Sequence, residues 1–218
     1  TGRLHANLRP GRVLNAFTRE MRWRHLDIVS GEAEAEAWLN FEAGYLISLN
    51  AGLQIPRLEV TSHGTGLPSL EDFSAAVGWQ RNPAPSQGRG QGLFAGGQWH
   101  VQDLQWRWRD QRVEGIDLKV QKVFAGKDTG YEITAASVPL TGLSALIREL
   151  DILPGAAQRA LERYQPGGTL AWARLRMPGS GDSPFELSAS MDNVSVVAHG
   201  GAPGGSNIDG FLWLDSRG

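Results

Sequence analysis

The amino-acid sequence predicts a mainly β fold with one pair of helices, an α+β arrangement in which the strands form an antiparallel meander. Three observations support this prediction. Polar and apolar residues alternate over long stretches, the 28 glycines and 11 prolines lie mostly between those stretches, and one segment changes to a spacing of three and four residues. Alternation places successive side chains on opposite faces of a strand, whereas the longer spacing marks one face of a helix.

The first two strands are predicted at residues 32–41 and 45–55, around a short turn at residues 42–44. Gly44 suits the positive φ that a hairpin loop requires. Each strand would span roughly 33 Å at about 3.3 Å per residue, which is long for a strand. Each has one apolar face, so the pair needs a large apolar surface opposite it, either a closed protein core or something that is not protein.

Further strands are predicted in the rest of the chain, with glycine-rich and proline-rich turns between them. A change of alternation near Asp103 indicates a β-bulge. The chain is expected to form one unit over residues 1–218, with possible sub-modules at 1–81 and 93–218 joined by the Gly/Pro/Gln-rich loop at 82–92. The expected strands are residues 72–80, 98–109, 114–121, 131–135, 168–177, 184–192 and 207–215.

The helix pair is predicted between residues 140 and 165, where Leu143, Leu146, Ile147 and Leu150 repeat at helical spacing. Pro154 suits the first position of the second helix, because proline has no N–H to donate there. A pair of short helices between strands would cover part of the sheet. A further helix is expected at residues 12–20.

Composition narrows the function classes. The chain has 218 residues, of which 41% are hydrophobic and 20% charged, and it is long enough to bury a sizeable core. The net charge of −2 gives no basic field for nucleic acid. The absence of cysteine excludes disulfides and thiol chemistry. No stretch reaches the roughly 20 apolar residues of a membrane-spanning helix. The chain starts without Met or a signal peptide, so we expect an internal piece of a longer protein.

Residues that could carry chemistry do not form a catalytic pattern. The five histidines show no metal-ligand spacing. Glu32, Glu34 and Glu36 alternate along one strand, which is typical of a solvated outer face. Residues 88–92 are glycine-rich but lack the Lys-Ser or Lys-Thr of a phosphate loop. We therefore predict a protein that is not an enzyme and uses no cofactor or metal.

Eight tryptophans are the remaining feature. Trp106 and Trp108 alternate with Arg107 and Arg109, so the rings share one face of a strand and the guanidiniums the other. Such rings could stack on nucleic-acid bases, line a carbohydrate site, fill a core, or border a groove for an amphipathic ligand. The slightly acidic balance favours core filling over nucleic acid.

Three stretches resemble the YhdP branch of the AsmA-like bacterial envelope proteins. Residues 31–45 (GEAEAEAWLNFEAGY) are similar to that family's charged hairpin. Residues 135–146 (AASVPLTGLSAL), followed by residues 150–170, are similar to its strand, paired helices and return strand. Residues 185–215 contain Ala202-Pro-Gly204 and then IDGFLWLD, similar to its last strands. Together they cover most of the chain.

This resemblance implies a curved, groove-like sheet, or β-taco, within a protein that is anchored in the inner membrane and crosses the periplasm of Gram-negative bacteria. It also implies similarity to bridge-like lipid transfer proteins, in which acyl chains lie in an apolar groove while head groups stay in water. The partners expected are phospholipid acyl chains, other segments of the same long chain and possible envelope proteins. Each sheltered methylene would contribute about 0.8 kcal/mol.

Candidates for the groove wall are the large apolar residues on the one-sided strands, although the same residues could fill a closed core. A second hypothesis is a structural or interaction module that binds another envelope protein through an exposed sheet edge. The groove candidates are Leu39, Phe41, Ile47, Leu49, Leu53, Ile55, Phe73, Val77, Ile116, Leu118, Val120, Ile133, Phe185 and Leu187.

Overall fold

The chain folds around one large antiparallel sheet, seen in a computed structural model that describes residues 2–11, 26–62, 65–82, 97–125, 128–150, 155–178 and 186–215. Twelve strands and two helices lie within these ranges. The strands are β1 Gly2–Gly11, β2 Leu26–Gly31, β3 Ala33–Glu42, β4 Tyr45–Ser62, β5 Thr65–Gly66, β6 Leu70–Arg81, β7 Gly97–Trp108, β8 Gln111–Ala125, β9 Asp128–Pro139, β10 Gly167–Pro178, β11 Glu186–Val196 and β12 Gly205–Asp215. The helices are α2 Leu140–Leu150 and α3 Gly155–Tyr164.

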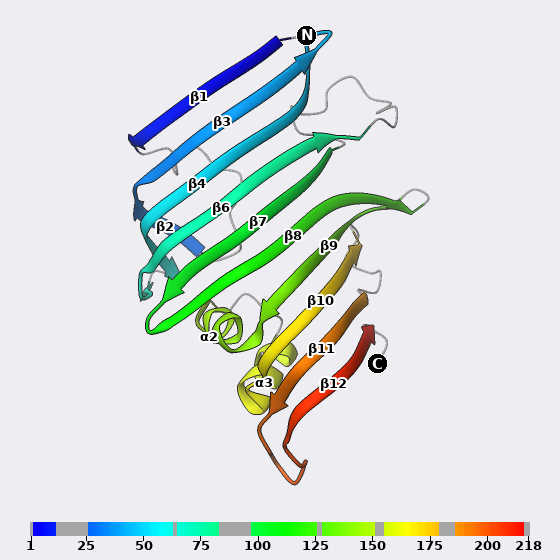
Figure 1. Cartoon of the computed structure of the whole chain (residues 1–218). Coiled ribbons are helices and arrows are strands. Elements are labelled where there is room, and N and C mark those ends of the chain that lie inside the picture. Colours follow the sequence, from blue (N-terminus) through cyan, green and yellow to red (C-terminus); the bar gives the residue numbers. More distant parts are fainter. Residues whose placement is uncertain are drawn as a thin grey trace.

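Strand order follows the chain closely. The sheet runs β1-β3-β4-β6-β7-β8-β9-β10-β11-β12, with β2 and β5 paired to β4 beside this path (Figure 1). The hairpin between β3 and β4 turns at Ala43 and Gly44, whose φ values of 50° and 81° fit a two-residue turn with positive φ at both positions. The prediction for Gly44 is therefore confirmed.

The long strand β4 changes partner along its length. Its first part pairs with β3 as far as Gln54, and its last part pairs with β2 from Leu58 onward. Pro56, which has no N–H to donate, lies in the interruption between the two ladders. Residue Glu32 separates β2 from β3, so these two strands follow one another along the same side of β4.

A line of backbone irregularities crosses the sheet from β6 to β12, and we call it the crease. Each of these seven strands has one residue with positive φ, and the strand ladders shift register at or near several of them. Bulges of this kind bend a strand and increase its twist. The bulge predicted near Asp103 is confirmed and is one member of the line. The crease residues are Asp72, Asp103, Gly115, Ser137, Gly168, Asn193 and Asn207.

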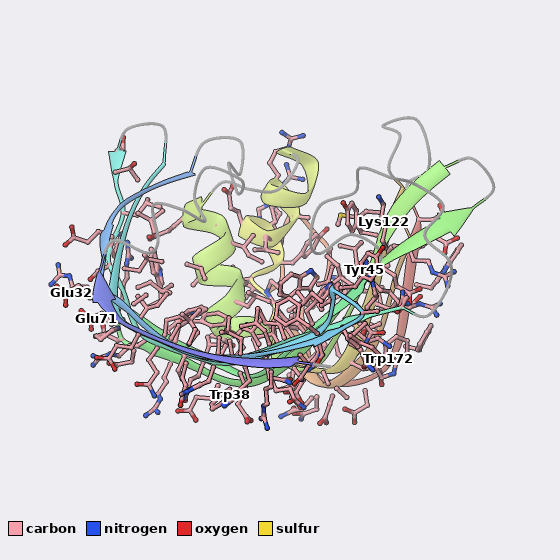
Figure 2. The ribbon with its side chains drawn as sticks, turned by 90° about the horizontal axis from the view of Figure 1, so that it is seen from above. Glu32, Trp38, Tyr45, Glu71, Lys122 and Trp172 are labelled. Atoms are coloured by element: carbon pink, nitrogen blue, oxygen red, sulfur yellow. The ribbon has the colours of Figure 1, made fainter. Side chains whose placement is uncertain are left out.

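The sheet curves into a trough. Seen from above, it has a U-shaped section with α2 and α3 on the concave side, while Trp38 projects from the convex side (Figure 2). The main buried cluster lies where α2 meets the sheet: Leu143 and Leu146 of α2 pack on Trp106, Trp108 and Val113 and their neighbours. A curved, groove-like antiparallel sheet with a helix pair is thus the fold that the sequence and its family resemblance predict.

Most of the predicted elements are present with small changes at their ends. The helix pair lies at Leu140–Leu150 and Gly155–Tyr164, and the sheet continues without a break in pairing from β6 to β7. Strands β1, β2 and β5 and the second part of β4 were not predicted. The turn expected at residues 126–130 is shorter, because Ala125 already pairs with Asp128. The helix expected at residues 12–20 and the position Pro154 lie outside the described residues.

Candidate functional site

Two apolar rows cross the concave face from one edge of the sheet to the other. Residues that pair in adjacent strands share a face, so the strand register identifies each row directly. The first, called the leucine row, is Leu4, Leu39, Leu49, Trp79, Trp99, Val120, Ile133, Leu175, Leu187 and Leu214. The second, called the alanine row, is Ala6, Ala37, Ala51, Val77, Val101, Leu118, Ala135, Ala173, Ala189 and Leu212.

The two rows differ in the reach of their side chains. Six of the ten members of the alanine row are alanine, whereas the leucine row consists of larger aliphatic and aromatic residues. The side chains of the alanine row therefore project less far from the backbone than those of the leucine row. Leu39, Leu49, Val77, Val101 and Leu118 in these rows are half-buried, so part of each side chain stays accessible.

One row on the convex face is polar along its whole length, although aromatic residues also lie on this face in the neighbouring rows. The polar row consists of Arg3, Asn40, Ser48, Gln80, Gln98, Gln121, Glu132, Arg176, Glu186 and Asp215. Neither apolar row contains a charged residue, while this row alone contains five. The sequence alternation therefore separates a solvated outer face from an inner face that carries the two apolar rows. Figure 2 shows Trp38 and Glu71 on the outside.

An ion pair on the convex face links three neighbouring strands. The guanidinium Nε of Arg176 donates to Oε2 of Glu132 at 2.7 Å, and the amide of Gln121 donates to Oε1 at 2.8 Å. The Arg176 hydrogen bond is the main reason that the pKa of Glu132 lies below its ordinary value, although burial opposes the change. The same contact raises the pKa of Arg176. These groups stabilise the outer face and do not reach the trough.

Two glycines let aromatic rings lie flat on the sheet. A Cβ at Gly97 would come within 2.1 Å of the Trp79 indole on the concave face, and a Cβ at Gly78 within 1.9 Å of the His100 imidazole on the convex face. Trp79 is fully buried and its ring centroid lies 6.5 Å from that of Trp99. These tryptophans therefore belong to the floor of the trough.

Each positive-φ residue of the crease shifts the alternation of its strand by one residue. On the far side of the crease, apolar side chains still face inward, but odd-numbered and even-numbered positions exchange roles. Leu70 follows Phe73 on β6 across Asp72, and Val138 follows Ala135 on β9 across Ser137. On β7 the rings of Trp106 and Trp108 are buried in this part, while Arg107 on the convex face pairs with Glu71 at 2.8 Å and Asp72 at 3.0 Å. The prediction that rings and guanidiniums occupy opposite faces is confirmed for Trp106, Arg107 and Trp108. This second wall of the trough carries α2.

A cavity of about 470 Å³ lies at the end of this wall, between the β7–β8 turn and α2. Five of its seven lining residues are polar or charged, and the other two, Trp108 and Ala145, are apolar. The lining consists of Trp108, Arg109, Asp110, Gln111, Ala145, Arg148 and Glu149. Arg109 forms an ion pair with Glu149 across the cavity wall. Sequence alternation gave no sign of this cavity, because it is built by a turn and a helix that are far apart in the chain.

The predicted groove residues can now be placed. Leu39, Leu49, Val120, Ile133 and Leu187 belong to the leucine row, and Val77 and Leu118 to the alanine row. Leu53 and the pair Ile55–Phe73 continue the same face toward the crease. Ile116 pairs with Leu104 beside the crease, and it is buried.

Four candidates need separate comment. Phe41 pairs with Leu46, so a register shift moves Ile47 out of the position that simple alternation assigns to it. Leu46, which was not among the candidates, is 2% exposed and takes the inward position. Leu118 packs against the buried cluster under α2, so it is less accessible than the residues of β3 and β4. Phe185 lies outside the described residues.

No group of three or more His, Asp or Glu residues in the described part of the chain is placed to hold a metal ion. Glu34 and Glu36 are exposed, and Oε1 of Glu36 lies 2.9 Å from the imidazole Nε2 of His5. Among the helices that the structure describes, neither has the length and hydrophobicity needed to cross a bilayer.

Comparison with known proteins places the chain in a family. The family profile described as YhdP protein matches residues 2–218. The chain belongs to the YhdP family. Neither a curated protein nor a solved structure gives a significant match. The long YhdP match agrees with the resemblance of the hairpin, the helix pair and the last strands, and it covers both apolar rows.

Proposed function

We propose that this chain is a segment of a periplasmic lipid transfer protein, anchored in the inner membrane, that shelters phospholipid acyl chains as they pass between the inner and outer membranes. Membership of the YhdP family supports the proposal, and the apolar rows that cross the whole sheet are the observation that carries it. No covalent chemistry is required for this activity.

The dimensions of the rows suit an acyl chain. Ten strands lie on the path from β1 to β12, and nine spacings of about 4.8 Å make each row about 43 Å long. One leaflet of a bilayer has about half of a hydrocarbon thickness of roughly 30 Å. An extended acyl chain therefore covers only part of a row and can move along it.

The alanine row is the surface on which we propose that the acyl chain lies. Six of its ten side chains are short alanine methyl groups, and the leucine row borders it with larger apolar groups. Each methylene removed from water contributes about 0.8 kcal/mol to the binding free energy. Because successive residues of the row are similar, no single position binds the acyl chain much more tightly than the next, and the chain can move. Head groups remain at the rim of the trough, in water.

A matched pair of variants tests the proposal. Leu49→Asp places a charge on the concave face, while Asn50→Asp places the same charge on the next residue of β4, on the convex face. Leu49 is half-buried, so its replacement should cost about 1–2 kcal/mol of folding stability. An acyl chain would have to desolvate the carboxylate, which should lower lipid binding at least about tenfold.

The measurement is mass spectrometry of the purified protein for bound phospholipid. We expect lipid with the native protein and with Asn50→Asp, and a large loss with Leu49→Asp while the fold persists. A native protein without lipid, or equal loss in both variants, would contradict the proposal. Unfolding of Leu49→Asp with no lipid in the native protein would indicate a closed core.

A second candidate function is binding of another envelope protein at the β12 edge. Strand β12 pairs only with β11 among the described strands, and its backbone edge could accept an added strand. Nearby on the convex face, Trp172 and Phe211 lie 5.7 Å apart and Trp213 is 57% exposed. A lipid-free protein whose partner binding is lost in Trp213→Ala would favour this function.

A further inference from the structure

We propose that strand β12 of one molecule pairs with strand β1 of a second copy, so that molecules join head to tail and the sheet continues from one copy to the next. The two strands lie at opposite ends of the sheet (Figure 1). Among the described strands, β1 pairs only with β3, and β12 pairs only with β11. The inference goes beyond the proposed function, because the pairing does not depend on lipid.

The composition of β12 is the first argument. Natural proteins protect permanent sheet edges with short strands, with prolines or with charged residues, above all lysine. Strand β12 is eleven residues long and contains no Lys, Arg or Pro. It therefore lacks the usual features that prevent a further strand from pairing with it.

The directions of the two strands are the second argument. Ten strands lie on the path from β1 to β12, and each pairs antiparallel with the next, so β1 and β12 run in opposite directions. A second copy that continues the sheet beyond β12 in the same orientation presents its β1 antiparallel. The junction then repeats the hydrogen-bond pattern found throughout the sheet.

The ends of the apolar rows fix the register of the junction. Leu4 and Leu214 end the leucine row, and Ala6 and Leu212 end the alanine row. In an antiparallel ladder, pairing Leu214 with Leu4 of the second copy places Leu212 opposite Ala6. Both rows then continue across the junction. Leu4 and Leu214 are 54% and 47% exposed in the single molecule, and each receives an apolar neighbour.

The same register suits the convex face. It places Trp213, which is exposed, opposite His5 of the second copy. The imidazole of His5 already stacks on Trp38, with 5.3 Å between the ring centroids. Aromatic side chains that lie opposite each other on neighbouring strands stabilise a sheet. The junction would therefore extend this stacked pair by a third ring.

Strand charge favours a second copy over other partners. Strand β1 contains two arginines and no acidic residue, whereas β12 contains two aspartates and no basic residue. Head-to-tail joining brings opposite charges together, but pairing of β12 with β12, or of β1 with β1, would bring like charges together. A foreign strand would need both the basic charge and the apolar alternation that β1 already has.

The contact is heterologous and does not close on itself in a straight array, so copies can add one after another. Each added copy contributes ten strands to the path. At about 4.8 Å per strand, each copy would lengthen the apolar rows by about 48 Å.

Cysteine cross-linking tests the junction, because the native chain has no cysteine. The Leu4→Cys and Leu214→Cys variants are mixed, treated with a short bis-maleimide and separated on a denaturing gel. We expect dimers from the mixture and none from either variant alone, because each junction joins residue 4 of one copy to residue 214 of another. The protein with both substitutions should give a ladder of dimers, trimers and longer products. Absence of dimers in the mixture, or dimers from one variant alone, would overturn the inference.

A charge reversal gives a second test in sedimentation experiments. We expect the mass of the native protein to rise with concentration. Arg3→Asp should weaken the association about tenfold, because β1 loses its charge complementarity to β12. Arg112→Asp makes the same change at a side chain that is 68% exposed on β8, away from both edges, and should leave the association unchanged. Equal weakening in both variants, or a native protein that stays monomeric, would contradict the proposed junction.

The outcome is separable from that of the proposed function. Phospholipid bound to a protein that stays monomeric would overturn only the present inference. Head-to-tail cross-linking of a protein that carries no lipid would retain the junction and contradict lipid transfer.

Discussion

The contact between α2 and the sheet makes a quantitative prediction about Gly142. A Cβ at this position would lie 2.4 Å from Cγ2 of Val113, which is fully buried. Alanine should gain about 1 kcal/mol of helix propensity over glycine. Overpacking against a rigid β-branched neighbour should cost about 1–3 kcal/mol. The clash should prevail, so Gly142→Ala is expected to lower the free energy of unfolding by up to about 2 kcal/mol.

A double-mutant cycle isolates the clash. Val113→Ala alone removes buried methyl groups and should cost about 2 kcal/mol, but it also provides the space that a methyl group at position 142 needs. Gly142→Ala combined with Val113→Ala should therefore cost at least about 1 kcal/mol less than the sum of the two single changes. Urea unfolding followed by tryptophan fluorescence measures all four proteins, because Trp106 and Trp108 lie in the same cluster.

Gly52→Ala is the matched control, since a Cβ there meets nothing within 4 Å. It should be neutral or slightly stabilising. If Gly142→Ala matched the native stability, or if the two changes were strictly additive, α2 would not be seated on Val113 as the structure places it.

Two further predictions concern the helix and the outer face. Cysteines at Val113 and Gly142 should form a disulfide, because the Cβ–Cβ separation is 3.9 Å and the native chain has no cysteine to compete. Closing a loop of about 30 residues should raise the free energy of unfolding by about 3.6 kcal/mol over the reduced form, as measured by urea unfolding. Lipid binding should persist, because α2 is a fixed part of the wall. Free thiols after oxidation would contradict the geometry. Glu132 has a folded-state pKa below its ordinary value of 4.5, so its contribution is present above pH 4.5 and is lost as pH falls through the lower folded-state pKa. Glu132→Gln should therefore destabilise the protein by about 0.5–1 kcal/mol at pH 7. Its stability should also fall less on acidification than that of the native protein, whereas Glu34→Gln should keep the native pH dependence. If the stability of Glu132→Gln fell with pH as that of the native protein does, the role of the Arg176 contact would be contradicted.

The two apolar rows were largely predictable from sequence, because alternation alone sets which residues share a strand face. Leu39 and Leu49 each lie on the face that alternation assigns to them, but a two-residue turn alone would pair Leu39 with Ser48, and the register shift beside Phe41 is what brings Leu39 opposite Leu49. The order of the later strands also follows from a simple meander. Strand β1 was missed even though Leu4, Ala6 and Leu8 alternate with polar residues, because three apolar residues among polar ones are a weak signal for a strand.

The crease was predicted only at Asp103. At the other positions the sequence signal is a one-residue shift in the apolar–polar alternation at an Asp, Asn, Ser or Gly. On β6, for example, the apolar positions shift between Phe73 and Leu70, with Asp72 between them. These residue types tolerate positive φ better than most, so the combination has a physical basis. The pairing of β2 with the far part of β4, and the cavity beside α2, depend on contacts between distant segments that alternation does not encode.

Photo-crosslinking in the native envelope tests the central claim most directly. A benzophenone side chain placed at residue 49 faces the apolar rows, and the same group at residue 50 faces the convex side. We expect phospholipid adducts at residue 49 and none at residue 50 when adducts are identified by mass spectrometry. Adducts at residue 50 alone, equal adducts at both positions, or no lipid at either would contradict transport along the concave face.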